Sequence, residues 1–239
     1  MLTEFLNRWP ALRGLVDFVY PPLCSGCGAY TEAVGAICDC CVAQIDWLES
    51  PIPLTDIDFR PTASDNTGTP DSFPLFAAGA YANPLNQIVI NFKFKGVTVP
   101  AESIAARVVD MFGEKIHKLA PAVLVPIPLH PSREYVRGYN QATIFATELA
   151  RRLELSVNES LLYRIKKRRP QAKLKKHRRL SNIKSVFEVD LSSEADQPVD
   201  RVILVDDVVT SGQTMFEARR CLMRVGYQVV GGISMAHAV

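Results

Sequence analysis

Long hydrophobic segments are missing from this chain of 239 residues, although 48% of its residues are hydrophobic. No apolar run approaches the roughly 20 residues that a membrane-spanning helix requires. The first twenty residues contain scattered charges and lack both a basic leader and an uninterrupted apolar stretch, so we expect a short amphipathic helix there rather than a secretory signal. These absences predict a cytoplasmic protein without a membrane span, built from one main domain and a smaller unit.

Cysteine is nearly absent after residue 41, where only Cys221 occurs. The other five cysteines are concentrated near the start of the chain, where Cys24 and Cys27 form one C-x-x-C pair. Cys38 and Cys41 form a second pair after a ten-residue spacer. Two such pairs are typical of a structural zinc site, in which four thiolates surround the ion tetrahedrally.

Other uses of these cysteines are less consistent with the sequence. A disulfide framework requires an oxidising compartment, and no secretory signal is expected here. A thioredoxin-like redox pair requires a βαβ context that the sequence around Cys24 does not provide. The ligand set is left open by Cys40, which could replace Cys38 or Cys41. Adjacent Cys40 and Cys41 would direct their side chains apart, which favours Cys38 together with Cys41.

Acidic residues are absent between Arg164 and Arg179, where ten of the 27 Lys and Arg residues lie. The remainder carries 17 cations against 25 acids, so the net charge of +2 conceals a strong asymmetry. Charge runs of this kind are usually solvated loop faces, which is one interpretation of this segment. The alternative is a polyanion contact, for which single-stranded DNA is the natural candidate.

Residues 51–74 are rich in Pro, Asp, Thr, Ser and Gly and show no periodicity, which predicts an exposed linker. This linker would separate a helix and zinc-ribbon module at residues 1–50 from a domain at residues 75–239. Within that domain we expect strands at 75–81, 123–129, 202–206 and 227–234, and helices at 84–94, 101–119, 141–153 and from the end of the third strand to about 225. Buried strands that alternate with helices predict an α/β fold with a Rossmann-like parallel sheet.

Two carboxylates, Asp206 and Asp207, end the apolar strand that begins at Val202. A turn of small and polar residues follows and leads into the next helix: Thr210, Ser211, Gly212, Gln213 and Thr214. Free N–H groups at a helix N-terminus favour phosphate, and carboxylates at the carboxyl end of a strand can hold sugar hydroxyls or Mg²⁺. Any α/β protein contains strands, turns and capped helices, but the adjacent acids favour a ligand site.

Basic residues follow the strand at 123–129 in a similar position. His130 is either an ordinary loop residue or a site residue, whereas Arg133 and Arg137 are planar cations able to grip a diphosphate. Asn140 is a candidate cap for the following helix. Lys93 and Lys95, which precede Gly96, either reach a phosphate or form the ordinary cationic end of a helix.

The segment from Arg201 to Met215 resembles the phosphoribosyl-pyrophosphate signature of type I phosphoribosyltransferases. This resemblance implies that Asp206 and Asp207 hold the ribose hydroxyls and that Thr210 to Thr214 bind the 5'-phosphate. The order of the motifs, which are the paired C-x-x-C, N-F-K-F-K-G, V-P-I-P-L-H-P-S-R-E-Y-V-R-G-Y-N-Q-A and V-D-D-V-V-T-S-G-Q-T, is similar to that of the ComF family. That family joins a zinc ribbon to a phosphoribosyltransferase-type domain and is linked to natural DNA uptake.

The ComF resemblance implies a pyrophosphate-binding role for the segment from Pro128 to Arg137. It also places a flexible loop over the site, where Gln171, Leu174, Arg179 and Asn182 match the Q-x-x-L and R-x-x-N pattern of the family. The expected ligands are structural zinc and phosphoribosyl pyrophosphate with Mg²⁺, and the expected setting is a DNA-uptake complex.

Three activities fit this resemblance. A phosphoribosyltransferase would stabilise the leaving diphosphate with Arg133, Arg137 and Mg²⁺. A non-catalytic adaptor would bind single-stranded DNA through the segment from Arg164 to Arg179 under control of the sugar phosphate. A nucleotide-salvage transferase would use a purine or pyrimidine acceptor. The sequence identifies no acceptor and leaves open whether the protein is an enzyme.

Overall fold

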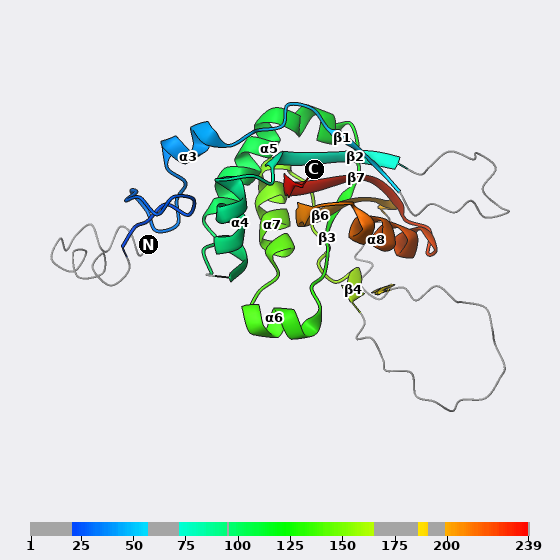
Figure 1. The fold of residues 1–239 in the computed structure, drawn as a ribbon. Coiled ribbons are helices and arrows are strands. Elements are labelled where there is room, and N and C mark those ends of the chain that lie inside the picture. The colour runs from blue at the N-terminus through cyan, green and yellow to red at the C-terminus, as the bar shows by residue number, and fades with distance from the viewer. Residues whose placement is uncertain (1–20, 57–71, 95, 165–185, 191–198, 239) are drawn as a thin grey trace.

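A five-stranded sheet forms the centre of the computed structural model, which describes residues 21–56, 72–94, 96–164, 186–190 and 199–238. Its strand order is β1-β2-β7-β6-β3, and helices cover both faces (Figure 1). The strands are β1 (Ile52–Thr55), β2 (Ser72–Ala80), β3 (Val123–Pro126), β6 (Arg201–Val209) and β7 (Gln228–His237). All neighbours pair in parallel except β1, which is antiparallel to β2. The predicted α/β fold class with a mostly parallel sheet is confirmed.

Two hydrophobic cores lie on opposite faces of the sheet because successive side chains of β6 alternate between them. Ile203 and Val205 join the core under α4 (Leu85–Phe94), α5 (Pro100–His117) and α7 (Gln141–Leu153). Val202 and Leu204 join the core under α8 (Gln213–Met223). This second core also contains residues of the short hairpin formed by β4 (Leu162–Arg164) and β5 (Phe187–Val189). The carboxyl end of β6 therefore presents side chains to both faces.

The helices expected from periodicity are present with small shifts at their ends. A proline at the start of α5 suits a position whose N–H has no partner within the helix. The side chain of Asn140 accepts a hydrogen bond from the backbone N–H of Ala142 and so caps α7 as predicted. Within the described ranges, the helices lack the length and apolar character needed to cross a membrane.

Structure is present at both ends of the segment predicted to be a linker. Strand β1 begins at Ile52, and β2 begins at Ser72 and pairs with it, so the expectation of irregular chain is wrong for these residues. The strand β1 contains Pro53, which is tolerated because an edge strand leaves one row of backbone groups unpaired. Residues 57–71 and the predicted helix at residues 1–20 lie outside the described residues, and the proposed domain limits stay a prediction.

The fold makes a direct prediction for the core under α5. The ring of Phe112 is fully buried and packs against the ring of Phe76 in β2. The two ring centroids are 5.6 Å apart. Phe112→Ala should lower the free energy of unfolding by about 3–5 kcal/mol, because a cavity replaces the ring. Urea denaturation measures this loss. Val136→Ala, at a residue that is 83% exposed, is the control and should change stability by less than about 0.5 kcal/mol.

Candidate functional site

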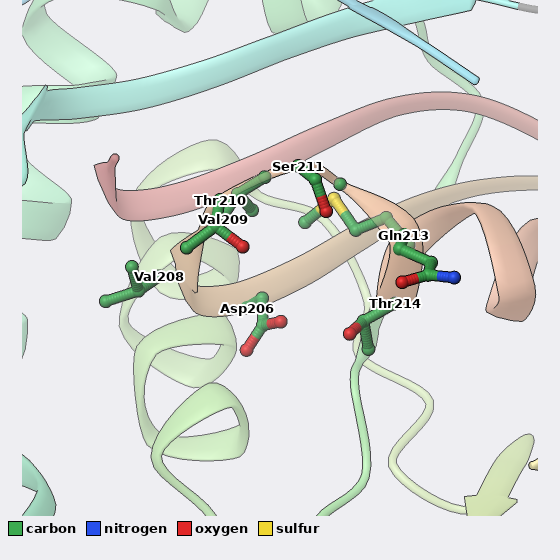
Figure 2. Close-up of a pocket in the computed structure, with 9 residues that line it drawn as sticks. Asp206, Val208, Val209, Thr210, Ser211, Gln213 and Thr214 are labelled. Atoms are coloured by element: carbon green, nitrogen blue, oxygen red, sulfur yellow. The ribbon is translucent and has the colours of Figure 1, made fainter. Parts of the chain in front are cut away.

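The loop between β6 and α8 carries the residues predicted to bind phosphate, and we call residues 210–214 the phosphate loop. The backbone of Gly212 has a φ of 75°, a left-handed conformation that glycine adopts without strain and that turns the chain into α8. Residues 208–215 and Asp206 line a pocket of about 150 Å³ (Figure 2). Pockets for whole small molecules usually begin near about 300 Å³, so this pocket suits a single phosphate-sized group.

The start of α8 supplies the pocket with hydrogen-bond donors. The N–H of Phe216 bonds the carbonyl of Gly212 at 3.0 Å and closes the first turn. In an α-helix the N–H groups of the first turn find no acceptor within the helix itself, and the helix dipole adds positive potential there. Figure 2 shows the carboxylate of Asp206 and the hydroxyl of Thr214 on the same side of the loop. The arrangement places anion-binding donors next to a carboxyl group whose oxygens can accept hydrogen bonds from hydroxyl groups.

The carboxyl group of Asp206 is held in an environment that disfavours its charge. Burial and then the neighbouring charge of Asp207 raise the pKa of Asp206 to about 8, although the backbone N–H of Asp207 donates to its Oδ1 at 2.8 Å. A ligand that supplies hydroxyl donors or a cation would favour the ionised form. A carboxyl with a raised pKa beside a pocket is a candidate binding group.

Asp207 faces the other side of the sheet. Its Oδ1 lies 2.8 Å from the Nζ of Lys93 at the end of α4, and both side chains are largely buried. The sequence predicted that Asp207 acts with Asp206 on ribose and that Lys93 contacts diphosphate. The structure instead shows these two predicted site residues paired with each other, which brings a cation from α4 to the carboxyl end of β6.

A buried glutamine connects Lys93 to the predicted arginine. Gln141, which is fully buried, donates to the carbonyl of Lys93 at 3.3 Å and accepts from Nη1 of Arg137 at 3.0 Å. The guanidinium of Arg137 also lies 4.8 Å from the ring centroid of Phe94. Sequence reasoning missed Gln141, because a polar residue at the start of a helix gives no signal of burial. Its contacts hold the Arg137 guanidinium and the backbone of Lys93, which come from distant parts of the chain.

The predicted basic loop contains a short helix, α6 (Pro131–Arg137), whose residues are exposed or half-buried. His130 precedes it, and its Nδ1 accepts from the N–H of Ser132 at 3.3 Å, which makes His130 a helix cap. Arg133 lies exposed on α6. Of the predicted pyrophosphate-binding residues, the structure thus brings Arg137 and Lys93 together and gives His130 a structural contact.

Several predicted residues lie outside the described residues. These are Lys95 and the flexible-loop residues Gln171, Arg179 and Asn182, together with the basic segment after Arg164. Arg164 itself ends β4, where its guanidinium lies 5.4 Å from the ring centroid of Phe187.

The sulfur atoms of Cys24, Cys27, Cys38 and Cys41 lie within 4.8 Å of one another. Cys24 and Cys41 are 3.7 Å apart, and Cys27 and Cys38 are 3.6 Å apart, measured between Sγ atoms. A tetrahedral zinc site with bonds of about 2.3 Å separates its sulfurs by about 3.8 Å, so the cluster fits the ion. The four predicted ligands are brought together, and the group does not include Cys40, which is exposed.

Backbone donors stabilise the thiolate of Cys24, one member of the cluster. Burial opposes ionisation of Cys24, but N–H groups of Cys38, Cys27 and Gly26 outweigh it and lower the pKa of Cys24 to about 6. The N–H groups of Gly26 and Cys38 each lie 3.3 Å from its Sγ. A thiolate stabilised in this way is the form that zinc binds.

Family models and related proteins agree with this architecture. A model described as "Phosphoribosyl transferase domain" matches residues 140–237, and a "Double zinc ribbon domain" model matches residues 15–52. Competence protein F of Haemophilus influenzae is 26% identical over all of both chains. Competence protein ComFC of Bacillus subtilis is 34% identical over 61% of this chain and 56% of that protein. The DNA utilization protein YhgH of Salmonella typhimurium is 28% identical over 65% of this chain and 68% of that protein.

Among solved structures, the UMP synthase of Leishmania donovani aligns with 77% of this chain and 29% of its own at 15% identity, and its TM-score of 0.32 is too low to support a structural argument. The parallel sheet, the phosphate loop and the four-cysteine cluster define a phosphoribosyltransferase-like protein with a zinc ribbon. These similarities support a ComF-type protein, in which a zinc ribbon precedes a phosphoribosyltransferase-like domain.

The cysteine cluster predicts different effects for neighbouring substitutions. Cys41→Ser should lower the zinc content from about one ion per chain to near zero, because it removes a buried ligand. Cys40→Ser is the matched control and should retain the zinc. Metal analysis of both proteins, purified under reducing conditions, measures the difference. Full zinc in Cys41→Ser would show that Cys40 takes its place.

The environment of Asp206 predicts a pH-dependent stability. A carboxyl whose pKa is about 8 in the folded chain, against about 3.9 when unfolded, retains its proton on folding and loses stability as the pH rises between these values. Asp206→Asn should match the wild type near pH 4 and exceed its free energy of unfolding by a few kcal/mol, to order of magnitude, above pH 8. Urea titrations from pH 4 to 9 test this, and parallel profiles for the two proteins would contradict it.

Proposed function

We propose that this chain binds phosphoribosyl pyrophosphate with Mg²⁺ at the carboxyl ends of β6 and β3. The observation that carries the proposal is the pocket that joins the half-buried Asp206 carboxyl to the phosphate loop. Cations from α4 and α6 lie at the same edge of the sheet, where Arg137 and Lys93 are linked through Gln141. A ribose with a phosphate at one end and a diphosphate at the other matches this order of groups.

Each part of the ligand would meet a different part of the site. The donors of residues 210–214 would bind the 5'-phosphate, and Asp206 and Asp207 would accept hydrogen bonds from the ribose hydroxyls. Arg133, Arg137 and Lys93 would contact the diphosphate, with His130 holding the start of α6 in place. Bound Mg²⁺ would neutralise charge on the diphosphate. Lys93 would then exchange part of its contact with Asp207 for the ligand, which frees Asp207 for ribose.

If the chain transfers the phosphoribosyl group, positioning and electrostatics would supply most of the rate. Arginines beside the diphosphate would stabilise the charge that develops on it as it leaves. The acids would hold the ribose while positive charge develops at its anomeric carbon. These roles use groups that bind the ligand in the ground state, so the same site also serves a protein that binds without transfer.

The names of the relatives support a role in the use of external DNA. Two are named competence proteins and one a DNA utilization protein. We therefore propose that this chain acts in DNA uptake on the cytoplasmic side of the membrane, as part of a DNA-uptake complex. The concentration of ten cations between Arg164 and Arg179 favours a second candidate, a non-catalytic adaptor that binds single-stranded DNA under control of the sugar phosphate.

Calorimetric titration with phosphoribosyl pyrophosphate and Mg²⁺ tests the ligand proposal. The double variant Asp206→Asn, Asp207→Asn should weaken binding at least about 100-fold, because each hydrogen bond to a charged group contributes about 1.5–3 kcal/mol. Arg151→Gln, at an exposed residue of α7, should leave the Kd unchanged. Equal affinity of the double variant and the wild type would refute the site.

Two further assays separate the two candidate activities. Release of pyrophosphate by the wild type in the presence of an acceptor would identify a transferase. An adaptor would release none, and its affinity for single-stranded DNA, measured by fluorescence anisotropy, would change when the sugar phosphate binds.

A further inference from the structure

The short strand β1 lies at the edge of the sheet in the segment whose sequence predicts a linker. It pairs with β2 in register, with Leu54 opposite Phe73 and Thr55 opposite Ser72. Leu54 is its buried residue, with an exposed fraction of 5%, and joins the core under α8. Pairing fixes the position of β1, so its inward side chain meets α8 at a defined point.

That point is the turn of the phosphate loop. A Cβ atom added to Gly212 would lie 2.7 Å from both Cδ1 and Cδ2 of Leu54, which is closer than carbon atoms approach. Glycine suits position 212 because of its positive φ, and a larger residue there would also displace the Leu54 side chain. The backbone of the phosphate loop rests directly on the Leu54 side chain.

A second contact follows directly after β1. Asp56, with an exposed fraction of 7%, forms an ion pair with Arg220 in the last turn of α8. The segment from Leu54 to Asp56 thus contacts α8 at both of its ends. A helix held at two points cannot tilt away from the sheet without breaking one of them.

We infer that Leu54 and Asp56 are positioning residues for the phosphate loop. Through them, β1 and the residue after it hold the N–H donors of the phosphate loop in place. Leu54 supports the backbone at Gly212, and Asp56 fixes the axis of α8 through Arg220. The inference rests on the proposed function for the identity of the anion. It concerns residues that contact the loop rather than the ligand.

Hydrogen exchange at two backbone amides measures the local stability of the two ends of α8 without any ligand. Phe216 donates to the carbonyl of Gly212 at 3.0 Å, and Tyr227 donates to the carbonyl of Leu222 at 3.2 Å beyond the other end of the helix. Leu54→Ala should increase hydrogen exchange at Phe216 about tenfold or more and at Tyr227 by less than threefold, because the cavity forms beside the loop. The matched control is Ile52→Ala, which also truncates an aliphatic residue of β1 and leaves Leu54 against Gly212.

Ligand affinity provides the second measurement. Leu54→Ala should raise the Kd for phosphoribosyl pyrophosphate with Mg²⁺ about tenfold, Ile52→Ala by less than about twofold, and Leu54→Met should restore the wild-type value within about threefold. Asp56→Asn, which retains Leu54, should also weaken binding and increase exchange at both amides. It keeps the inference testable if Leu54→Ala fails to fold.

The outcomes separate this inference from the proposed function. Equal exchange at Phe216 in Leu54→Ala and Ile52→Ala, or exchange at the wild-type rate in Leu54→Ala and Asp56→Asn, would overturn the inference. A wild type that does not bind phosphoribosyl pyrophosphate would overturn the proposed ligand. Selective exchange at Phe216 would then still support the positioning role.

Discussion

The carboxyl end of β6 imposes the constraint on which the site depends. A strand directs consecutive side chains to opposite faces, so Asp206 and Asp207 belong to different environments although they are neighbours in sequence. Asp206 is held beside the phosphate loop with its charge disfavoured, whereas Asp207 is neutralised by Lys93. One pair of acids therefore connects the α8 face to the α4 face, and a ligand that crosses the edge of the sheet meets both.

The Asp207 and Lys93 ion pair also orders the cationic side of the site. Lys93 lies at the end of α4, and its carbonyl accepts a hydrogen bond from the buried Gln141. Gln141 in turn holds Arg137. A buried polar side chain is costly unless its hydrogen-bonding groups find partners, and both ends of the Gln141 amide do so here. The cations are consequently placed before a ligand arrives, which reduces the ordering cost of binding.

Local patterns carried most of the fold. Three local signals predict elements that the structure contains: the apolar run from Val202, the cap at Asn140 and the spacing of the four cysteines. Each signal depends on residues that are close in the sequence. The start of α6 was also encoded, because Pro131 follows a capping residue and Gly138 ends the helix with a positive φ. The basic residues of this segment nevertheless indicate a ligand-contacting loop, and so the sequence predicts a loop where the structure has a short helix.

Contacts between distant segments could not be predicted in the same way. Strand β1 has only four residues and contains a proline, so its sequence indicates a linker, and its pairing with β2 depends on the fold of the whole sheet. The partners of Lys93 and Gln141 likewise depend on how α4 and α7 pack.

The chain between the zinc ribbon and the phosphate loop shows why such contacts matter. After the zinc-ligand position Cys41, Ile45 enters the core, and Trp47 forms a bridge with Gly79 of β2. Gly79 admits this crossing because an added Cβ would lie 2.8 Å from the carbonyl oxygen of Asp46. The chain then continues along β2 as β1 and reaches Gly212 through Leu54. The zinc ribbon and the phosphate loop therefore both contact the chain that runs along β2, and a displacement of this chain would affect both.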